Sequence, residues 1–282
     1  MRIIKNINEI RDAVKKEKRE DRTVALVPTM GALHDGHLSL IRKARETADA
    51  VVVSVYVNPT QFAPNEDFDA YPRQLEEDAK TCEKEGVSYV FAPDDTVIYT
   101  KERFIRYEID GLRDHLCGRS RPHHFQGVLL IVSKLFHIVN PDYAVFGQKD
   151  IQQFRIIERM VKELNFDIQI IMGETVRATD GLALSSRNQY LSDSERSIAP
   201  GLYHSLKNTV RKVTDEPNKV QDILKSQEEL LKEKGFKIDY LNVVDYETLQ
   251  PVNQLDSTKK YIVAGAVYLS STRLIDNIIF TI

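Results

Sequence analysis

Two histidines stand three residues apart in the stretch PTMGALHDGH, residues 28 to 37, where an apolar run gives way to an amphipathic one. Gly31 and Gly36 allow a tight turn and a close approach of the backbone to a ligand. A helix starting near His37 would present unpaired N–H groups and the positive end of its dipole. His34 and His37 would add donors for phosphate oxygens, and each stabilises developing negative charge better when protonated. The stretch therefore predicts an anion site.

Other roles exist for such a pair. One histidine could cap a turn while the other packs in the core, or both could bind a metal. Zinc is disfavoured, because it needs a third and a fourth ligand and no Cys or Glu stands at a helpful spacing nearby. The two glycines and the strand-to-helix setting favour the phosphates of a nucleotide over the other roles.

Two well-known nucleotide motifs are missing. The chain contains neither GxGxxG nor GxxxxGK[ST], so no dinucleotide fingerprint and no P-loop supports hydride transfer or γ-phosphoryl transfer. The nucleotide chemistry that remains for such a site is attack at the α-phosphorus.

Three further motifs carry polar side chains to the same region. NPTQF (58–62) follows an expected strand and offers Gln61, which has both a donor and an acceptor. FGQKDIQQ (146–153) follows another strand and offers Lys149. SSRN (185–188) offers two hydroxyls and a guanidinium for the β- and γ-phosphates. SSRN lies on a loop on the far side and is weak evidence by itself. Ligands of open α/β sheets bind beyond the carboxyl ends of the strands, where PTMGALHDGH, NPTQF and FGQKDIQQ converge.

The hydrophobic pattern predicts the elements that position these residues. Strands rich in Val and Ile are expected at 23–28, 50–57, 87–93, 142–147 and 166–172. Helices are expected between them at 37–49, 71–86, 127–139 and 150–164. Strands without strict alternation indicate a parallel sheet that is covered on both faces. We therefore predict a doubly wound, Rossmann-like α/β nucleotide-binding domain over residues 1–175.

The pattern changes after about residue 175. A polar loop with Gly181 as a possible hinge is followed by two polar helices, at about 194–213 and 220–234, and by strands at 236–245, 261–269 and 273–282. Strands that follow helices without alternating with them indicate a smaller α+β domain. Residues 176–282 are expected to form it.

The bulk composition excludes several classes of protein. A net charge of −3 shows no excess of basic residues of the kind that binds a nucleic-acid backbone. Cys82 and Cys117 are the only cysteines, which favours a reducing cytosol over an export pathway. The N-terminus lacks the apolar core of a signal peptide, and the longest apolar run, Gly127 to Val139, is too short to span a bilayer. We expect a cytoplasmic protein with neither a nucleic-acid nor a membrane partner.

Seven motifs of the chain closely resemble those of the pantothenate synthetases (pantoate:β-alanine ligases), within the HIGH-type nucleotidylyltransferases. The motifs are PTMGALHDGH, VYVNPTQF, YPR, HFQGV, IVSKLF, FGQKDIQQ and GLALSSRN. They occur in the family's order over residues 28 to 188. The resemblance implies that the C-terminal domain is a lid and that the chain is a homodimer. It implies a reaction in which pantoate and ATP form pantoyl adenylate and pyrophosphate, after which β-alanine displaces AMP to give pantothenate.

The resemblance also assigns roles to individual residues. It implies that His37, His34 and Lys149 are catalytic, with His37 as a proton donor, and that Gln61 and Gln153 bind pantoate. It implies ATP contacts from Met30, Gly31, Ala32, Leu33, His34, Asp35, Gly36, His37, Gly147, Gln148, Lys149, Asp150, Val176, Leu184, Ser185, Ser186 and Arg187. Mg²⁺ is expected to bridge phosphate oxygens, with no protein ligand identified. Glu77 or Asp78 could lie near the ion, although an exposed helix face is favoured for both.

The sequence departs from the common family pattern in places and leaves rival functions open. Gln148 stands where many relatives have Glu, and His123 and Gln126 stand where Gly and a charged residue are usual. A related adenylyl- or cytidylyltransferase would act on a phosphorylated substrate and would want more Lys or Arg near its acceptor site. An aminoacyl-tRNA synthetase would need an RNA-binding region, which the negative net charge of the chain disfavours. A nucleotide sensor would bind ATP without turnover.

Overall fold

The computed structural model describes residues 1–64, 66–102 and 104–282. The chain divides into two compact units. Unit 1 comprises Met1–Glu108, His123–Gly147 and Ile156–Glu174. Unit 2 comprises Ile109–Pro122, Gln148–Arg155 and Thr175–Ile282, so it combines two short earlier segments with the whole C-terminal part of the chain.

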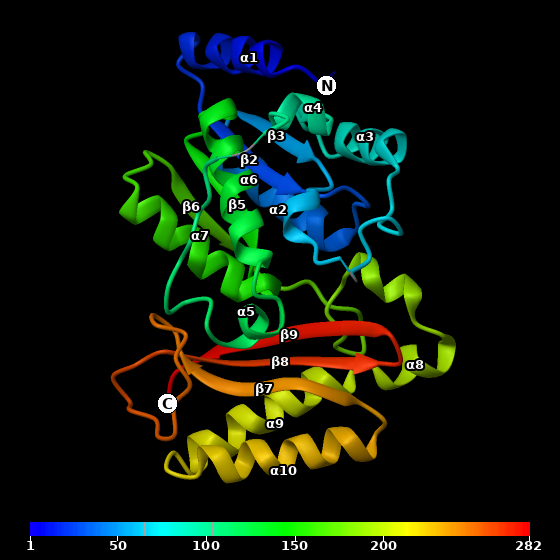
Figure 1. The fold of residues 1–282 in the computed structure, drawn as a ribbon, viewed down its shortest axis with the longest axis vertical. Helices are drawn as coiled ribbons and strands as arrows, with labels where there is room; N and C mark the ends of the chain where they lie inside the picture. Colours follow the sequence, from blue (N-terminus) through cyan, green and yellow to red (C-terminus); the bar gives the residue numbers. More distant parts are fainter. Residues whose placement is uncertain (65, 103) are drawn as a thin grey trace. The chain divides into compact units, whose positions relative to one another are not determined.

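Unit 1 is built on a parallel sheet, as the sequence predicted (Figure 1). Within the described residues this sheet has six strands in the order β1-β4-β3-β2-β5-β6. The strands are β1 (Arg2–Ile4), β2 (Val24–Thr29), β3 (Ala50–Val55), β4 (Tyr89–Phe91), β5 (Tyr143–Gly147) and β6 (Gln169–Gly173). Strand β1 was not predicted, because its only apolar residues, Ile3 and Ile4, stand between Arg2 and Lys5, whereas the equally short β4 lies within the longer apolar run 87–93.

Helices cover both faces of this sheet. On one face Val27, Val53 and Val145 form a buried cluster with Leu40 and Ile41. The last two lie on α2 (Asp35–Thr47). On the other face the ring of Phe146 packs edge-on against Phe136 of α6 (His124–Val139), with 6.4 Å between centroids. Two covered faces explain why the strands read as unbroken apolar runs.

The other described helices that precede residue 175 have the following bounds. They are α1 (Ile7–Arg19), α3 (Leu75–Lys84), α4 (Asp95–Ile98), α5 (Leu116–Ser120) and α7 (Ile151–Glu163). Three short 3-10 turns are η1 (Pro59–Gln61), η2 (Gln148–Asp150) and η3 (Ser186–Tyr190). Helix α3 is closed by Gly86 as expected, since that residue has a φ of +71°. In the described part of the chain, no helix is both long enough and apolar enough to cross a membrane.

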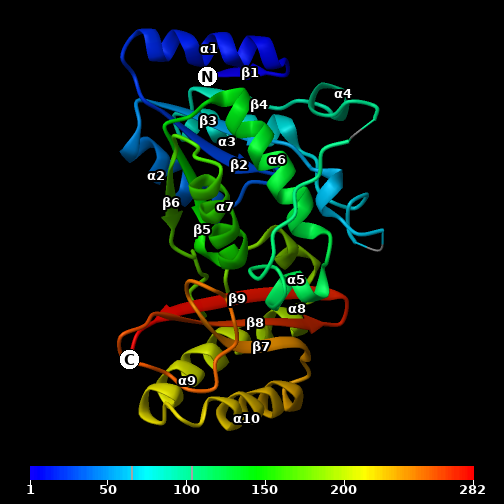
Figure 2. The same cartoon turned by 60° about the vertical axis from the view of Figure 1, so that its left-hand side comes forward.

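Unit 2 has the α+β class that the sequence predicted for residues 176–282, and it also contains residues 109–122 and 148–155 (Figure 2). Its described residues form a three-stranded antiparallel sheet in the order β7-β8-β9. The strands are β7 (Lys237–Asp245), β8 (Tyr261–Leu269) and β9 (Thr272–Phe280), and the helices are α8 (Asp193–Ile198), α9 (Gly201–Asp215) and α10 (Val220–Glu233). The core joins the sheet to α9 and α10 through residues such as Leu206, Leu231 and Val263.

Helix α3 begins at Leu75 rather than at residue 71 and α6 begins at His124 rather than at residue 127, and two further helix boundaries differ for a local reason. The helix expected at 194–213 is divided into α8 and α9 by Pro200, which lacks the N–H that a helix interior needs. Helix α2 begins at Asp35 rather than near His37, because the His34 side chain caps it. His37 therefore lies inside the first turn of α2 and not at its start.

Candidate active site

Three of the sequence motifs lie at the ends of neighbouring strands in the unit 1 sheet. The stretch 30–37 follows β2, the stretch 58–62 follows β3, and Gly147 ends β5. These strands stand side by side in the order β3-β2-β5. They are parallel, so their carboxyl ends meet at one edge. Strands β3 and β5 lie on opposite sides of β2, because the chain runs from β2 through β3 and β4 and then returns past β2 to form β5. This is the switch point at which open α/β sheets bind ligands.

A tight turn at this edge connects β2 to α2. Gly31 has a φ of +82°, and Ala32 follows in the left-handed region with a φ of +51°. A side chain at Gly31 would place its Cβ 2.8 Å from the Oδ2 atom of Asp78. The position requires glycine for both its conformation and its lack of space.

Asp78 on α3 holds this turn in place. Its carboxylate accepts the N–H of Ala32 at 3.0 Å and the N–H of Leu33 at 2.8 Å, and the residue is only 1% exposed. The expectation that Asp78 lies on an exposed helix face is therefore wrong, whereas its neighbour Glu77 is exposed. In the described residues, no group of three or more His, Cys, Asp or Glu side chains is arranged to hold a metal ion.

The two histidines form a reciprocal cap on α2. The Nδ1 atom of His34 accepts the N–H of Gly36 at 3.1 Å, and the Nδ1 atom of His37 accepts the N–H of His34 at 3.3 Å. The rings lie 4.1 Å apart between centroids. An Nδ1 atom that accepts carries no proton, so the neutral form of each ring carries its proton on Nε2. The cap thus fixes both imidazoles as Nε2–H donors at the positive end of a helix.

Gln61 lies beside Met30 at the end of β3. Its Nε2 donates to the Met30 sulfur at 3.1 Å, and its Oε1 accepts from Asn58 Nδ2 at 3.0 Å. Asn58 is 1% exposed and also accepts from the Tyr99 hydroxyl at 2.7 Å. This network sets the orientation of the Gln61 side chain.

Helix α6 packs directly on η1. The Nδ1 atom of His124 donates to the Gln61 carbonyl at 2.9 Å. A Cβ on Gly127 would lie 2.2 Å from the Thr60 carbonyl oxygen, so only glycine allows this approach. Of the two unusual residues nearby, His123 is exposed and Gln126 donates to Glu108 at 3.1 Å.

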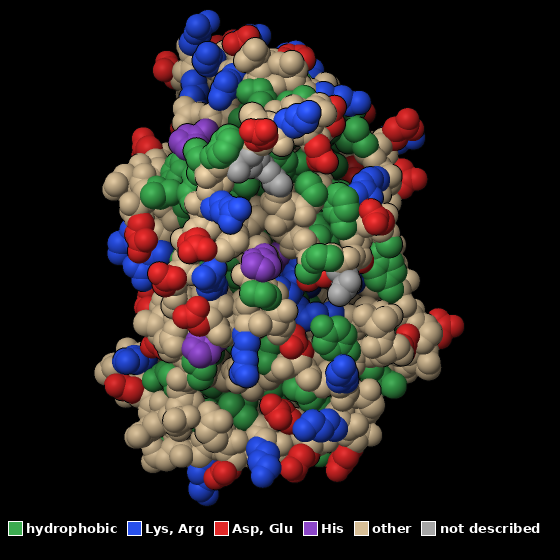
Figure 3. All heavy atoms as spheres, viewed as in Figure 1, with side chains coloured by type: hydrophobic (Ala, Val, Ile, Leu, Met, Phe, Trp, Pro, Cys, Tyr) green, Lys and Arg blue, Asp and Glu red, His purple; other side chains and the backbone are tan. Residues whose placement is uncertain are grey.

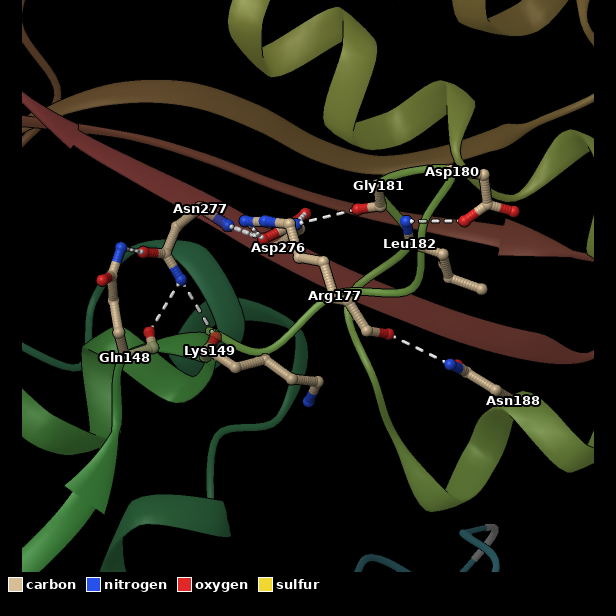
Figure 4. A network of polar contacts seen from close by, with 10 residues as sticks. Gln148, Lys149, Arg177, Asp180, Gly181, Leu182, Asn188, Asp276 and Asn277 are labelled. Carbon is tan, nitrogen blue, oxygen red and sulfur yellow. Dashed lines mark hydrogen bonds and ion pairs between the residues drawn. The ribbon is translucent and has the colours of Figure 1, made fainter. Parts of the chain in front are cut away.

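In unit 2, Lys149 and Gln148 lie in the turn η2, which is hydrogen-bonded to Asn277 of β9 (Figure 4). The Asn277 Nδ2 donates to the carbonyls of Gln148 and Lys149 at 2.8 and 3.0 Å, and its Oδ1 accepts from Gln148 Nε2 at 3.3 Å. The Lys149 ammonium lies 3.5 Å from the Asp150 carboxylate, and the Lys149 side chain is 22% exposed.

The first turn of α7 holds two adjacent glutamines with different surroundings. Gln152 is 4% exposed, and its amide donates at 2.8 Å to each of two carbonyls, those of Leu112 and His115. Its oxygen accepts from the N–H of Gly118 at 3.3 Å. Gln153, the residue that the sequence assigned to pantoate, is half-buried.

The loop that leads to SSRN is a small hairpin. The carbonyl of Val176 accepts from the N–H of Leu184 at 3.0 Å, and the Ser185 hydroxyl caps η3 by accepting from the N–H of Arg187 at 3.3 Å. The tip of the hairpin is Gly181, with a φ of +96°. Leu184, Ser185, Ser186 and Arg187 are all half-buried.

A buried ion pair anchors this hairpin. Arg177 donates to both oxygens of Asp276 at 2.5 and 2.9 Å, and it donates to the carbonyl of Gly181 at 3.2 Å (Figure 4). The Arg177 guanidinium lies 3.7 Å from the ring centroid of Tyr203. Burial raises the pKa of Asp276, and the charges of Arg177 and Lys149 oppose that shift.

The predicted residues therefore form two sets. Unit 1 holds the set from Met30 to His37 together with Gln61 and Gly147, and unit 2 holds Gln148 to Asp150, Gln153, Val176 and Leu184 to Arg187. The sequence pattern assigned no role to Asn58, His124, Asp276 or Asn277. Asn58 stands in NPTQF, where Asn before Pro at a strand end is typical of a cap, and His124 begins HFQGV, whereas no motif marks Asp276 or Asn277.

Comparison with known proteins identifies the family. A family model described as pantoate-beta-alanine ligase matches residues 2–279. A pantothenate synthetase of Caldicellulosiruptor saccharolyticus is 47% identical over 280 residues, and one of Thermotoga petrophila is 48% identical over 283 residues. In both cases the match covers 99% of this chain and 99% of the relative.

Solved structures agree with the sequence matches. The crystal structure of pantothenate synthetase from Thermus thermophilus has a TM-score of 0.90 at 42% identity and covers 99% of both chains. The pantoate-beta-alanine ligase of Francisella tularensis, solved in complex with beta-gamma ATP and beta-alanine, has a TM-score of 0.81 at 34% identity, with 99% of this chain and 97% of that one covered. The match over almost its whole length shows that the chain belongs to the pantoate–β-alanine ligase family.

Proposed function

We propose that the chain condenses pantoate with β-alanine at the expense of ATP, through a pantoyl-adenylate intermediate, and releases AMP and pyrophosphate. Membership of the ligase family supports the overall reaction. The observation that carries the residue assignment is the reciprocal cap of His34 and His37, which directs an Nε2–H from each ring away from the backbone of α2.

In the first step the pantoate carboxylate attacks the α-phosphorus of ATP, and the bond from that phosphorus to the bridging oxygen of pyrophosphate breaks. We assign His34 and His37 to the phosphates, where their Nε2–H groups and the α2 dipole offset the charge that builds on the leaving group. Lys149 and Arg187 neutralise further phosphate charge. ATP binds as its Mg²⁺ complex, in which phosphate oxygens and water supply most of the ligands.

In the second step the amine of β-alanine attacks the carbonyl carbon of the adenylate, and the bond to the AMP oxygen breaks. Adenylation has replaced a poor leaving group by a good one. The protein must hold the mixed anhydride away from water and present the amine in line. Well-oriented reactants reach effective molarities of roughly 10⁵ to 10⁸ M.

We assign Gln61 and Gln153 to the hydroxyls and the carboxylate of pantoate. The Gln61 Nε2 donates to the Met30 thioether, which is a weaker acceptor than a pantoate oxygen would be. A pocket that hydrogen-bonds a hydroxyl rejects analogues that lack it far better than an apolar pocket does. This selectivity is what a hydroxy-acid substrate requires.

The remaining assignments concern the cellular setting. We propose a cytoplasmic homodimer, on the strength of the motif resemblance and of two free cysteines. On the face drawn in Figure 3, acidic and basic side chains are interspersed and no broad basic area is visible. A partner set of small molecules only is consistent with this face. Light scattering of the purified chain tests the dimer.

The reaction is tested by omission of each substrate. With ATP, pantoate and β-alanine present, AMP should accumulate in a one-to-one ratio with a product that has the mass of pantothenate. Omission of pantoate should stop AMP release. AMP or pyrophosphate release that requires a phosphorylated acceptor instead of pantoate would show a different nucleotidylyltransferase, and ATP binding without any turnover would show a sensor.

A further inference from the structure

Two consecutive residues of β9 contact both of the unit 2 segments that we assign to ATP. Asn277 contacts the turn η2 and Asp276 contacts the loop that starts at Val176 (Figure 4). Adjacent residues of a strand project to opposite sides of the strand, so one short piece of backbone reaches both segments. Both residues are almost fully buried, with Asp276 at 4% and Asn277 at 1% exposure.

Asn277 uses its whole amide on η2. Its two N–H groups go to two successive carbonyls, and its oxygen accepts from Gln148. Only this orientation of the amide satisfies both carbonyls, which fixes the assignment of Nδ2 and Oδ1. These contacts fix the backbone from which Lys149 extends, and Figure 4 shows that side chain running away from Asn277. Asn277 therefore controls the direction of the Lys149 ammonium without touching it.

Asp276 acts on the hairpin through Arg177. The carboxylate holds the guanidinium on two oxygens, and the same guanidinium binds the Gly181 carbonyl and stacks on Tyr203. A bidentate pair of this kind restricts direction as well as distance. The backbone of Arg177 pairs with Ala183, the residue directly before the stretch Leu184 to Arg187. Through this chain of contacts, Asp276 fixes the base of the segment that carries Arg187.

We propose that Asp276 and Asn277 are positioning residues for the nucleotide, which keep the cations of Lys149 and Arg187 in a fixed relation to the triphosphate. The inference rests on the proposed role of those two cations in ATP binding. It predicts that each β9 residue acts through one particular cation: Asn277 through Lys149, and Asp276 through Arg187. A residue that merely stabilises unit 2 would act through neither.

The test is a double-mutant cycle on the full-length chain, read by calorimetric binding of adenylyl imidodiphosphate with Mg²⁺. Asn277→Ala should weaken binding about tenfold in the wild-type background and less than about twofold in a Lys149→Ala background. Asp276→Asn should show the same contrast with Arg187→Ala. Equal losses in both backgrounds would overturn the proposal.

A control variant in the same sheet tests whether a loss of binding follows from a general loss of stability. Asp239→Asn removes a comparable ion pair, since Asp239 accepts from Arg273 at 2.7 and 3.0 Å. It should lower the unfolding temperature and leave analogue binding within about twofold. If Asn277→Ala does not fold, Asn277→Leu serves instead, because it fills a similar volume, adds no charge and removes the amide contacts to η2. A loss of binding by Asp239→Asn equal to that of Asp276→Asn would also contradict the proposal.

The same measurements separate this inference from the proposed function. If the wild type binds the analogue and the cycles couple as expected, but pantoate supports no adenylation, the positioning role stands and the acid substrate is wrong. If the wild type does not bind the analogue, the nucleotide assignment fails and the positioning role fails with it.

Discussion

The backbone N–H of His34 donates to the Nδ1 atom of His37 across the first turn of α2, at 3.3 Å. This contact gives the second histidine a structural role as well as the chemical role that we assign to it. The first histidine also has both roles, since its own Nδ1 caps Gly36. The cap therefore depends on the Nδ1 atom of each ring and the proposed phosphate contact depends on Nε2. A substitution can remove one of these roles and keep the other.

His34→Asn is expected to separate them most cleanly. Asparagine is a good N-cap and can still accept from Gly36, but it has no group in the place of Nε2–H. The unfolding temperature should stay near that of the wild type, while the rate of pantoyl-adenylate formation falls by about 100-fold or more. His34→Ala should lose the same activity and in addition about 1 kcal/mol of stability. His37→Ala should likewise retain its fold and lose most of the adenylation rate, and near-normal turnover by either variant would refute the assigned role.

Asp78→Ala should destabilise the whole of unit 1. It leaves the N–H groups of Ala32 and Leu33 buried without an acceptor, which costs about 2 to 4 kcal/mol of the free energy of unfolding. Urea denaturation measures this loss. The matched control is Glu77→Ala one residue earlier, whose exposed side chain should change that free energy by less than about 0.5 kcal/mol. If the two variants are equally stable, Asp78 does not hold the turn.

The neighbouring glutamines of α7 should give opposite results. Gln153→Ala is expected to raise the KM for pantoate about tenfold or more while leaving the unfolding temperature unchanged, because it removes a proposed substrate contact. Gln152→Ala is expected to lower the unfolding temperature, since it breaks three hydrogen bonds to the segment 112–118. Its KM for pantoate, measured well below that temperature, should stay within about twofold. Exchange of these two phenotypes would show that the pantoate contact was assigned to the wrong glutamine.

The stability of unit 1 should depend on pH in the alkaline range through Tyr89. Burial and a 2.5 Å hydrogen bond to Glu17 raise the pKa of this phenol from 10.0 to about 12. The folded state holds the proton more tightly than the unfolded state, so this stabilisation is complete below pH 10 and is lost as the pH rises toward 12. The difference in unfolding free energy between wild type and Tyr89→Phe should therefore shrink between pH 10 and pH 12. A constant difference across that range would contradict the assigned shift.

The sequence predicted the architecture well where the pattern was long. Runs such as 50–57 and 127–139 carry enough apolar residues to identify a buried strand and a buried helix, and both are present in the structure, with α6 starting three residues earlier than expected. It failed where an element holds very few apolar residues or where its start depends on a single capping side chain. The strand β1 has three residues, and the start of α2 depends on an imidazole cap, for which no general sequence signal exists.

For the candidate site, the sequence could assign roles only to residues that stand in recognisable motifs. His34, His37 and Lys149 stand in recognisable motifs, whereas Asp78 and Asn277 lie 45 or more residues away in sequence from the backbone groups they hold. Such contacts are set by tertiary packing, which no local pattern in a single sequence reports. The error on Asp78 has the same origin, since an acidic run in a helix usually marks an exposed face.

The central claim is tested most directly by exchange of labelled pyrophosphate into ATP, with Mg²⁺ and pantoate present and β-alanine absent. Reversible formation of pantoyl adenylate predicts rapid exchange that requires pantoate and that His37→Ala abolishes. If ATP binds and no pantoate-dependent exchange occurs, the adenylate mechanism is contradicted, and the assignment of Gln61 and Gln153 to pantoate falls with it.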